Sequence, residues 1–147
     1  MNIHNTSDHV QVKPILDPEV RTAAANGAAV DCRGFERAMV ILHVGAHDRT
    51  TGDETLDVKI QESSDNAAAD AFADVAGAAF AQIAAQVIDA TKGNSFVMNI
   101  DLTKRERYLR VVGTPAGTTP STNYSVQILL LNARNAPVSQ DSAVISV

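Results

Sequence analysis

The chain of 147 residues has no tryptophan, a single cysteine, and only 4% aromatic residues. The lone Cys32 cannot form an internal disulfide, which argues against the class of small secreted domains that disulfides hold together. Cations are also in short supply, because 12 Lys and Arg stand against 17 Asp and Glu, a net charge of −5. Nucleic acids and anionic membranes both require a basic surface, so we expect neither as a partner.

Long apolar runs and an export signal are missing as well. The longest apolar runs, residues 38–44 and 126–133, fall far short of the ~20 residues that span a bilayer. The first ten residues, MNIHNTSDHV, lack the basic-then-apolar pattern of a signal peptide. We therefore expect a protein made in the cytoplasm, and 147 residues are most simply one domain with a single core.

The chain does contain segments in which apolar and polar residues alternate with a period of two. Leu56, Val58 and Ile60 alternate with polar neighbours, as in a strand with one buried face. The run 37–46 is almost continuously apolar, which predicts a strand covered on both faces. Similar patterns separated by turn-forming residues predict further strands over residues 10–16, 28–35, 95–102, 107–114 and 123–132.

The alanine-rich stretch 62–93 is ambiguous. Alanine is the best helix former, and the apolar residues fall close to one helical face: Phe72, Val75, Phe80, Ile83 and Val87. The flanking segments alternate like strands, however, and local propensity is a weak prior. From these residues alone, one helix and a pair of short strands are both open.

Six or more strands spaced by turns predict an all-β fold, an antiparallel β-sandwich of the jelly-roll kind with at most short helical turns. Pro14 confines the first segment to an edge or a bend. We expect an N-terminal arm or edge strand at 1–16, a sandwich domain at 17–131, and an extended C-terminal arm at 132–147.

Metal-binding chemistry finds little support in the sequence. His43 and His47 lie four residues apart with Cys32 and Asp48 nearby, but on a strand this spacing separates the two histidines by about 13 Å. Packed or surface histidines are the better interpretation, and we expect no metal and no cofactor.

The acidic loop around Asp48, Asp53, Glu54 and Asp57 has no register typical of a calcium loop. We interpret it as a solvated loop, with a cation site as the lesser alternative. Ser63 and Asp65 predict an Asx-type turn rather than a nucleophile, because no partner histidine follows in a suitable context. The chain also has no glycine-rich phosphate loop, and we expect that it is not an enzyme.

One cluster of residues is a candidate interaction patch: Arg105, Arg107, Tyr108 and Arg110, next to Lys104. Such a patch could bind a carbohydrate, a phosphate or an acidic neighbouring subunit. Alternatively, the arginines form ordinary surface pairs with the abundant acids. Both interpretations stay open.

Three short motifs carry a resemblance to a known family. They are Gln61-Glu62-Ser63-x-Asp65, then Phe72 with Asp74 and Val75, and finally Arg107-Tyr108-x-Arg110. Over residues 28–139 the chain resembles small virion proteins encoded near the major capsid gene of tailed phages and prophages, of the head decoration or minor capsid type. The same skeleton is similar to discoidin-type, galactose-binding jelly rolls. Both resemblances imply β structure through 56–83.

The resemblance implies a structural protein on the capsid surface of the virion, made in the host cytoplasm. It would decorate or cement the head through multivalent contacts with the major capsid protein lattice, as a homo-oligomer such as a trimer. We expect residues 1–16 and 132–147 to make the contacts. The alternative is a carbohydrate-binding jelly-roll module, a spike or adhesion domain displayed on the virion that binds a glycan. The scarcity of aromatic rings counts against it.

Overall fold

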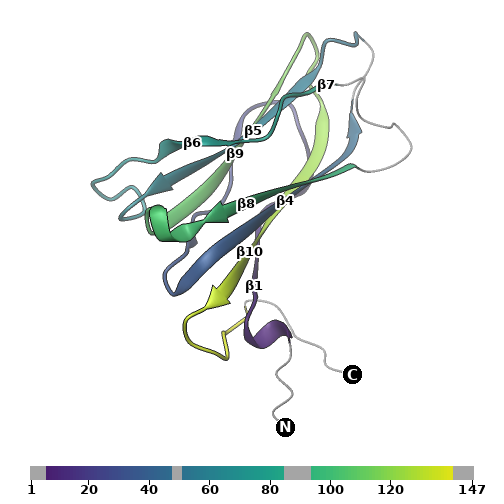
Figure 1. Ribbon diagram of the computed structural model, residues 1–147. Helices are drawn as coiled ribbons and strands as arrows, with labels where there is room; N and C mark the ends of the chain where they lie inside the picture. The colour runs from purple at the N-terminus through teal and green to yellow at the C-terminus, as the bar shows by residue number, and fades with distance from the viewer. Residues whose placement is uncertain (1–5, 48–50, 85–93, 141–147) are drawn as a thin grey trace.

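The computed structural model of the protein describes residues 6–47, 51–84 and 94–140. The chain folds into two antiparallel β-sheets packed face to face (Figure 1). The described residues outside strands include two single 3₁₀ turns, η1 (Thr6–Asp8) and η2 (Leu102–Lys104). The prediction of an all-β sandwich with short helical turns is confirmed.

The first sheet, called sheet A here, has the strand order β1-β10-β4-β8, and all its neighbours are antiparallel. Its outermost strands are β1 and β8. The bounds of the strands are Gln11–Arg21 for β1, Phe35–His47 for β4, Asn94–Asp101 for β8 and Thr122–Ala133 for β10.

The second sheet, sheet B, has the order β2-β9-β5-β6, with the two-residue strands β3 and β7 pairing with β9 and β5. Of the strand expected at 28–35, only the short β3 forms. The bounds are Ala25–Asn26 for β2, Val30–Asp31 for β3, Thr55–Ser63 for β5, Ala73–Ala79 for β6, Ile83–Ala84 for β7 and Tyr108–Ala116 for β9.

The core lies between the two sheets and follows the alternation in the sequence. Leu56, Val58 and Ile60 are at most 1% exposed, as their spacing predicts. They pack in one cluster with inward residues of sheet A such as Leu42 and Ile128. Each such side chain contributes about 1.5–3 kcal/mol when fully buried, so this cluster supplies most of the stabilisation of the sandwich.

The prediction that strand 37–46 is covered on both faces is wrong. Val40, Leu42 and Val44 are fully buried, whereas Met39 and Ile41 on the other face are only partly buried. The reason is that the described residues form two layers, so the outer face of sheet A has no third layer above it. Some of the apolar residues of β4 therefore lie at the surface of the sandwich.

The described part of the alanine-rich stretch forms turns and short strands. Asn66 and Ala67 have φ of 62° and 64°, which is incompatible with continuing a right-handed helix. The chain then returns as β6, antiparallel to β5, so that Asp74 pairs with Gln61. Cross-strand pairing thus outweighs the helix propensity of alanine; residues 85–93 lie outside the described residues.

The expected division into arms and body stays a prediction. Strand β1 continues across the expected boundary at residue 16, and Ile15 and Leu16 both belong to the core cluster. Strand β10 likewise continues to Ala133. Of the expected arms, residues 1–5 and 141–147 lie outside the described residues.

Candidate interaction surfaces

Arg107, the residue just before β9, forms the best-defined ion pair of the predicted patch. Its Nε and Nη2 donate to the two carboxylate oxygens of Asp31, at 3.1 and 2.6 Å. Asp31 is in place because β3 pairs with β9, which sets Asp31 opposite Tyr108. The guanidinium also lies 4.7 Å from the centroid of the Tyr108 ring. The hydrogen bonds from Arg107 lower the pKa of the Asp31 carboxyl, and the same pair raises the pKa of Arg107.

The other two arginines of the patch also have partners within the chain. Arg105 Nη1 donates to Glu62 Oε1 at 3.2 Å. Arg110 Nε donates to Gln61 Oε1 at 2.8 Å, and its guanidinium lies 4.3 Å from the Phe72 ring centroid. These contacts match the interpretation of internal surface pairs, and each restricts how freely an arginine can bind an external anion.

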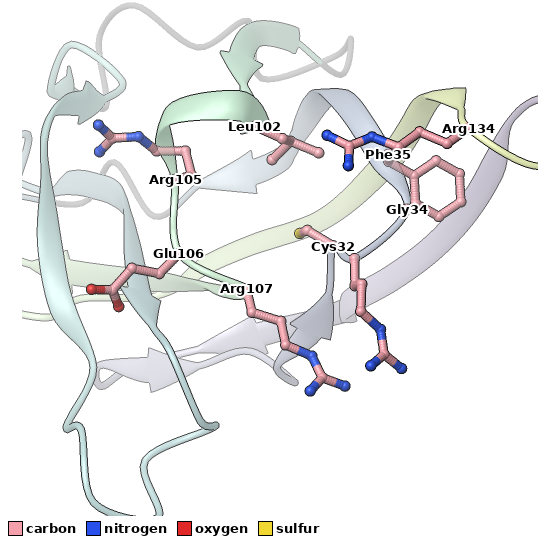
Figure 2. Close-up of a pocket in the computed structure, with 9 residues that line it drawn as sticks. Cys32, Gly34, Phe35, Leu102, Arg105, Glu106, Arg107 and Arg134 are labelled. Atoms are coloured by element: carbon pink, nitrogen blue, oxygen red, sulfur yellow. The ribbon is translucent and has the colours of Figure 1, made fainter.

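The four predicted residues do not form a single site. Arg105 and Arg107 line a pocket of about 320 Å³ at one end of the sandwich, shown in Figure 2. Tyr108 and Arg110 do not line this pocket. Alternate residues of β9 point to opposite faces of sheet B, and these two side chains point away from the core. Whether any of the four residues contacts a partner stays a prediction.

Sequence reasoning missed other residues of this pocket. Phe35 and Leu102 supply apolar surface, and the Arg134 side chain extends toward them in Figure 2. The Arg134 N–H donates to the Gly34 carbonyl at 2.8 Å, which brings the end of β10 beside the turn before β4. The pairing register of the two long apolar strands, β4 and β10, is the sequence signal that could have placed Arg134 beside this pocket. The mixture of guanidinium groups and apolar surface suits a protein contact.

Cys32 and His43 cannot share a metal ion. Cys32 lies just before β4, and His43 is eight residues past the start of that strand, about 26 Å away along an extended chain. Cys32 is buried, and desolvation raises the pKa of its thiol to about 12. His43 Nδ1 instead shares a hydrogen bond with Ser95 Oγ at 2.8 Å. Within the described ranges, no group of three His, Cys, Asp or Glu side chains could hold a metal.

The acidic loop is not fully solvated as expected, because Glu54 is completely buried. Its Oε1 accepts hydrogen bonds from the hydroxyls of Thr51 and Thr119. Asp53 is exposed and accepts from Thr51 and from the Thr118 N–H and hydroxyl, which lower the pKa of the Asp53 carboxyl. Threonine hydroxyls thus take the place of water and join this loop to the β9–β10 loop.

The Asx-type turn predicted at Ser63 and Asp65 is present. The Asp65 carboxylate accepts hydrogen bonds from the backbone N–H groups of Ala68, Ala69 and Asp70, at 3.0, 2.7 and 3.1 Å. Ser63 Oγ accepts from the Ala67 N–H at 2.9 Å and donates to the Asp70 carbonyl at 2.7 Å. Both side chains serve the local backbone, which accounts for them without any catalytic role.

The described ends of the chain lie together on one side of β1. The Val138 N–H donates to the Asp8 carbonyl at 3.0 Å, and Gln140 Nε2 donates to the carbonyls of Ser7 and Val10. The Val12 N–H also donates to Gln140 Oε1, which places Gln140 on the side of β1 away from β10. The two expected arms therefore start from the same region of the surface.

Comparison with known proteins supports the fold more than the function. No protein-family model and no curated protein sequence matches this chain. The chain is similar to the PBSX exported protein XepA at 16% identity and a TM-score of 0.50, over 99% of this chain but only 45% of XepA. It is also similar to the SPBc2 prophage-derived protein YomS, at 11% identity and a TM-score of 0.46 over 88% of this chain and 99% of that one.

A carbohydrate-binding structure resembles it as well. The CBM22-1 xylan-binding domain of Paenibacillus barcinonensis Xyn10C matches at 16% identity and a TM-score of 0.44, over 83% of this chain and 82% of that domain. At 16% identity the match to XepA shows a similarity of fold alone. No helix in the described residues is long and apolar enough to cross a membrane.

Proposed function

We propose that this protein is a structural component of a phage or prophage virion that decorates or cements the capsid surface. The observation that carries the proposal is the arrangement of the ends of the chain. Residues 7–10 and 138–140 are hydrogen-bonded to each other beside the edge strand β1, so both arms leave a rigid sandwich from one place. Two arms that start together can contact one patch of a lattice.

Several features of the described residues support this role over catalysis. Several conspicuous polar groups have internal partners: Arg107 with Asp31, Arg105 with Glu62, and Glu54 Oε1 with two threonines. Glu54 Oε2 and the Tyr124 hydroxyl are buried without a hydrogen-bond partner. The thiol of Cys32 is buried and poorly ionised. The similarity to two prophage proteins agrees with a phage origin. We therefore propose a binding protein without enzymatic activity, localised at the capsid surface.

The mechanism would be multivalent attachment. One arm contact of about 4 kcal/mol corresponds to only millimolar affinity. A homo-oligomer that engages two or three lattice sites at once gains about 10²–10⁴ in avidity without any new contact. Arms suit such binding because an extended segment can add a strand to the open sheet edge of a capsid subunit.

The test mixes purified protein with undecorated heads of the phage that encodes it. We expect the full chain to pellet with heads and to raise the temperature at which they release DNA. A variant without residues 1–5 and 141–147, the two segments outside the hydrogen-bonded ends, should keep the same circular dichroism spectrum but bind at least tenfold more weakly. Lys59→Ala, on the outer face of sheet B, serves as the control that should still bind.

The outcome that overturns the proposal is a folded full chain that neither pellets with heads nor changes their rupture temperature. A glycan array then decides whether the carbohydrate-binding alternative takes its place. Binding to xylan or galactose-containing glycans, without binding to heads, would assign the protein to that class instead.

A further inference from the structure

One side of the sandwich is open between β6 and β8. Strand β8 is the last strand of sheet A and pairs with β4, and β6 is the last strand of sheet B and pairs with β5. In the described part of the chain, neither strand has a ladder partner on its other side. Both edges therefore present backbone groups that an added strand could pair with.

A groove of about 280 Å³ runs between these two edges, which lie on the same side of the molecule in Figure 1. Its apolar lining includes members of the core cluster, so the groove reaches down to the hydrophobic interior. β6 contributes small residues there, which leaves room for an inserted side chain. The lining residues that matter here are Val75, Ala76, Ala78, Met98, Ile100 and Lys104.

The outer face beside this edge is apolar as well. Val97 on β8 is 55% exposed, an unusual position for a large aliphatic side chain. It lies on the outer face of sheet A, opposite Ile41 in the β4–β8 pairing. A strand added along β8 would cover part of Val97 while its alternate residues entered the groove.

We propose that this edge groove binds residues 141–147 of a second copy of the chain. The segment reads DSAVISV. In a strand, Ala143, Ile145 and Val147 share one face, which matches the apolar groove, and Val144 lies on the other face, toward Val97. Seven residues extend to about 23 Å, and the eight residues of β8 to about 26 Å, so the segment and the edge match in length.

Charge gives the direction of the added strand. Lys104 and Arg105 lie at the end of the groove where β8 finishes, with Asp101 between Lys104 and Arg37 and with Glu62 paired to Arg105, so three cations face two carboxylates there. Asp141 begins the segment and has the opposite sign. Placing Asp141 at this end makes the segment run antiparallel to β8, the pairing that both sheets already use.

The reach of the chain argues for a second copy rather than the same one. Gln140 lies on the far side of β1, and β1 and β8 are opposite edges of a four-stranded sheet. Three strand spacings of about 4.8 Å, and one more to Gln140, put roughly 19 Å between Gln140 and β8. Residues 141–147 would use nearly their whole length to arrive and could not lie along the groove. When residues 141–147 come from a second copy, they do not have to span this distance and can lie along the groove.

This inference deepens the proposed function, because it gives the homo-oligomer a contact, but its test needs no capsid. Sedimentation velocity of the full chain should show concentration-dependent self-association. Ile145→Asp should weaken the association at least tenfold, because it puts a charge into the apolar groove. Ser146→Asp adds the same charge on the opposite face and should weaken it by less than threefold.

A second matched pair probes the groove itself. Ala76→Trp fills the groove from an exposed position on β6, and we expect it to weaken association at least tenfold. Ala73→Trp places the same ring on the same strand but outside the groove, and should have little effect. Circular dichroism checks that each variant is folded.

Disulfide cross-linking between two copies tests the contact independently of those variants. Full-length Asn99→Cys mixed with full-length Ser142→Cys, the position opposite Asn99 when Val144 faces Val97, should form a disulfide-linked heterodimer under mild oxidation, whereas Gln127→Cys in place of Asn99→Cys should not. A full chain that stays monomeric, or paired variants that behave alike with no trapped dimer, overturns the inference. If such monomers still pellet with heads, the arm binds a capsid subunit and the proposed function survives. If the chain self-associates but does not bind heads, only the proposed function fails.

Discussion

Gly113 on β9 and Tyr124 on β10 fit together across the two sheets. A Cβ atom at position 113 would overlap the Tyr124 hydroxyl oxygen, so the phenol occupies the space that any other residue at 113 would fill. Tyr124 is 1% exposed, and Arg21 covers its ring at 4.8 Å from the centroid. Desolvation raises the pKa of the tyrosine hydroxyl. The spacing of the sheets at this point is therefore set by one glycine and one large side chain.

We predict that Gly113→Ala destabilises the protein by about 1–3 kcal/mol, the usual cost of forcing extra volume into a packed core. The matched control is Gly45→Ala, where the nearest atom to an added Cβ lies at an ordinary 3.5 Å. The control should change the free energy of unfolding by about 0.5 kcal/mol or less. Urea denaturation of both variants measures the difference, and equal effects would show that the Gly113–Tyr124 contact has room to relax.

A second prediction tests the register of β5. Val58 is 1% exposed and faces the core, so Val58→Asp buries an unpaired charge and should cost several kcal/mol, enough to unfold the domain. Lys59 is next to it but its side chain is 42% exposed, in an ion pair with Asp74. Lys59→Asp should cost about 1 kcal/mol, because it loses an exposed pair and sets a second carboxylate near Asp74, where water screens both effects. Thermal unfolding of the two variants compares them, and similar stabilities would mean that the register is wrong.

Much of the sandwich could be predicted because strand alternation reports directly on burial. From Leu56 to Ile60 in β5 every second residue is buried, and the sequence shows the same period. The outer face of β4 could not be predicted, because Met39 and Ile41 are apolar although the part of the chain that the structure describes has no third layer to cover them. The alanine-rich stretch was ambiguous for a related reason: whether β6 forms depends on its pairing with β5, which is a long-range property.

The interaction patch illustrates a different limit. The sequence correctly groups Arg105, Arg107 and Arg110 near one another, since they occupy one short segment. It does not show that Asp31 and Glu62, 76 and 43 residues away, supply their counter-charges. Nor does it show the groove between β6 and β8, which exists only because two edges from different sheets meet. Surfaces built from distant strands require the fold.

A third prediction concerns acid stability. Because Arg107 lowers the pKa of Asp31 in the folded state, this carboxylate stabilises the protein above the unfolded pKa of about 3.9. That stabilisation is lost as the pH falls through the lowered folded pKa. At pH 7, Asp31→Asn should therefore cost under about 1 kcal/mol, since the pair is 38% exposed on both sides and is screened by water. The cost should shrink toward zero below about pH 3.

Arg107→Gln provides the partner variant for a double-mutant cycle on this ion pair. It should be less stable at pH 7 by a similar amount, and the double variant should cost less than the sum of the two single variants. Urea unfolding at pH 7 and at pH 2.5 gives all the required free energies. Additive effects at pH 7 would mean that the two side chains do not stabilise each other.

The last prediction uses the reactivity of Cys32 to detect local opening of the sandwich next to β3. The thiol is 5% exposed, and burial raises its pKa to about 12 from the ordinary 9.0. Only the thiolate reacts with disulfide or alkylating reagents, so at pH 8 the native thiol should react about a thousandfold more slowly than the same thiol in urea. Cys32 lies beside Arg107 through the hydrogen bond from its N–H to the Arg107 carbonyl, 2.8 Å long.

Reaction of Cys32 in the native protein therefore reports separation of β3 from β9. Arg107→Gln should raise the native rate severalfold, because it weakens the ion pair that holds Asp31, the neighbour of Cys32, against β9. Ser139→Cys in a Cys32→Ser background gives the rate of an exposed thiol for comparison. A Cys32 that reacts as fast as Cys at position 139 would contradict its burial. The end of the sandwich that carries the arginine-lined pocket would then be open to solvent, and the pocket would no longer be a fixed surface for a partner to bind.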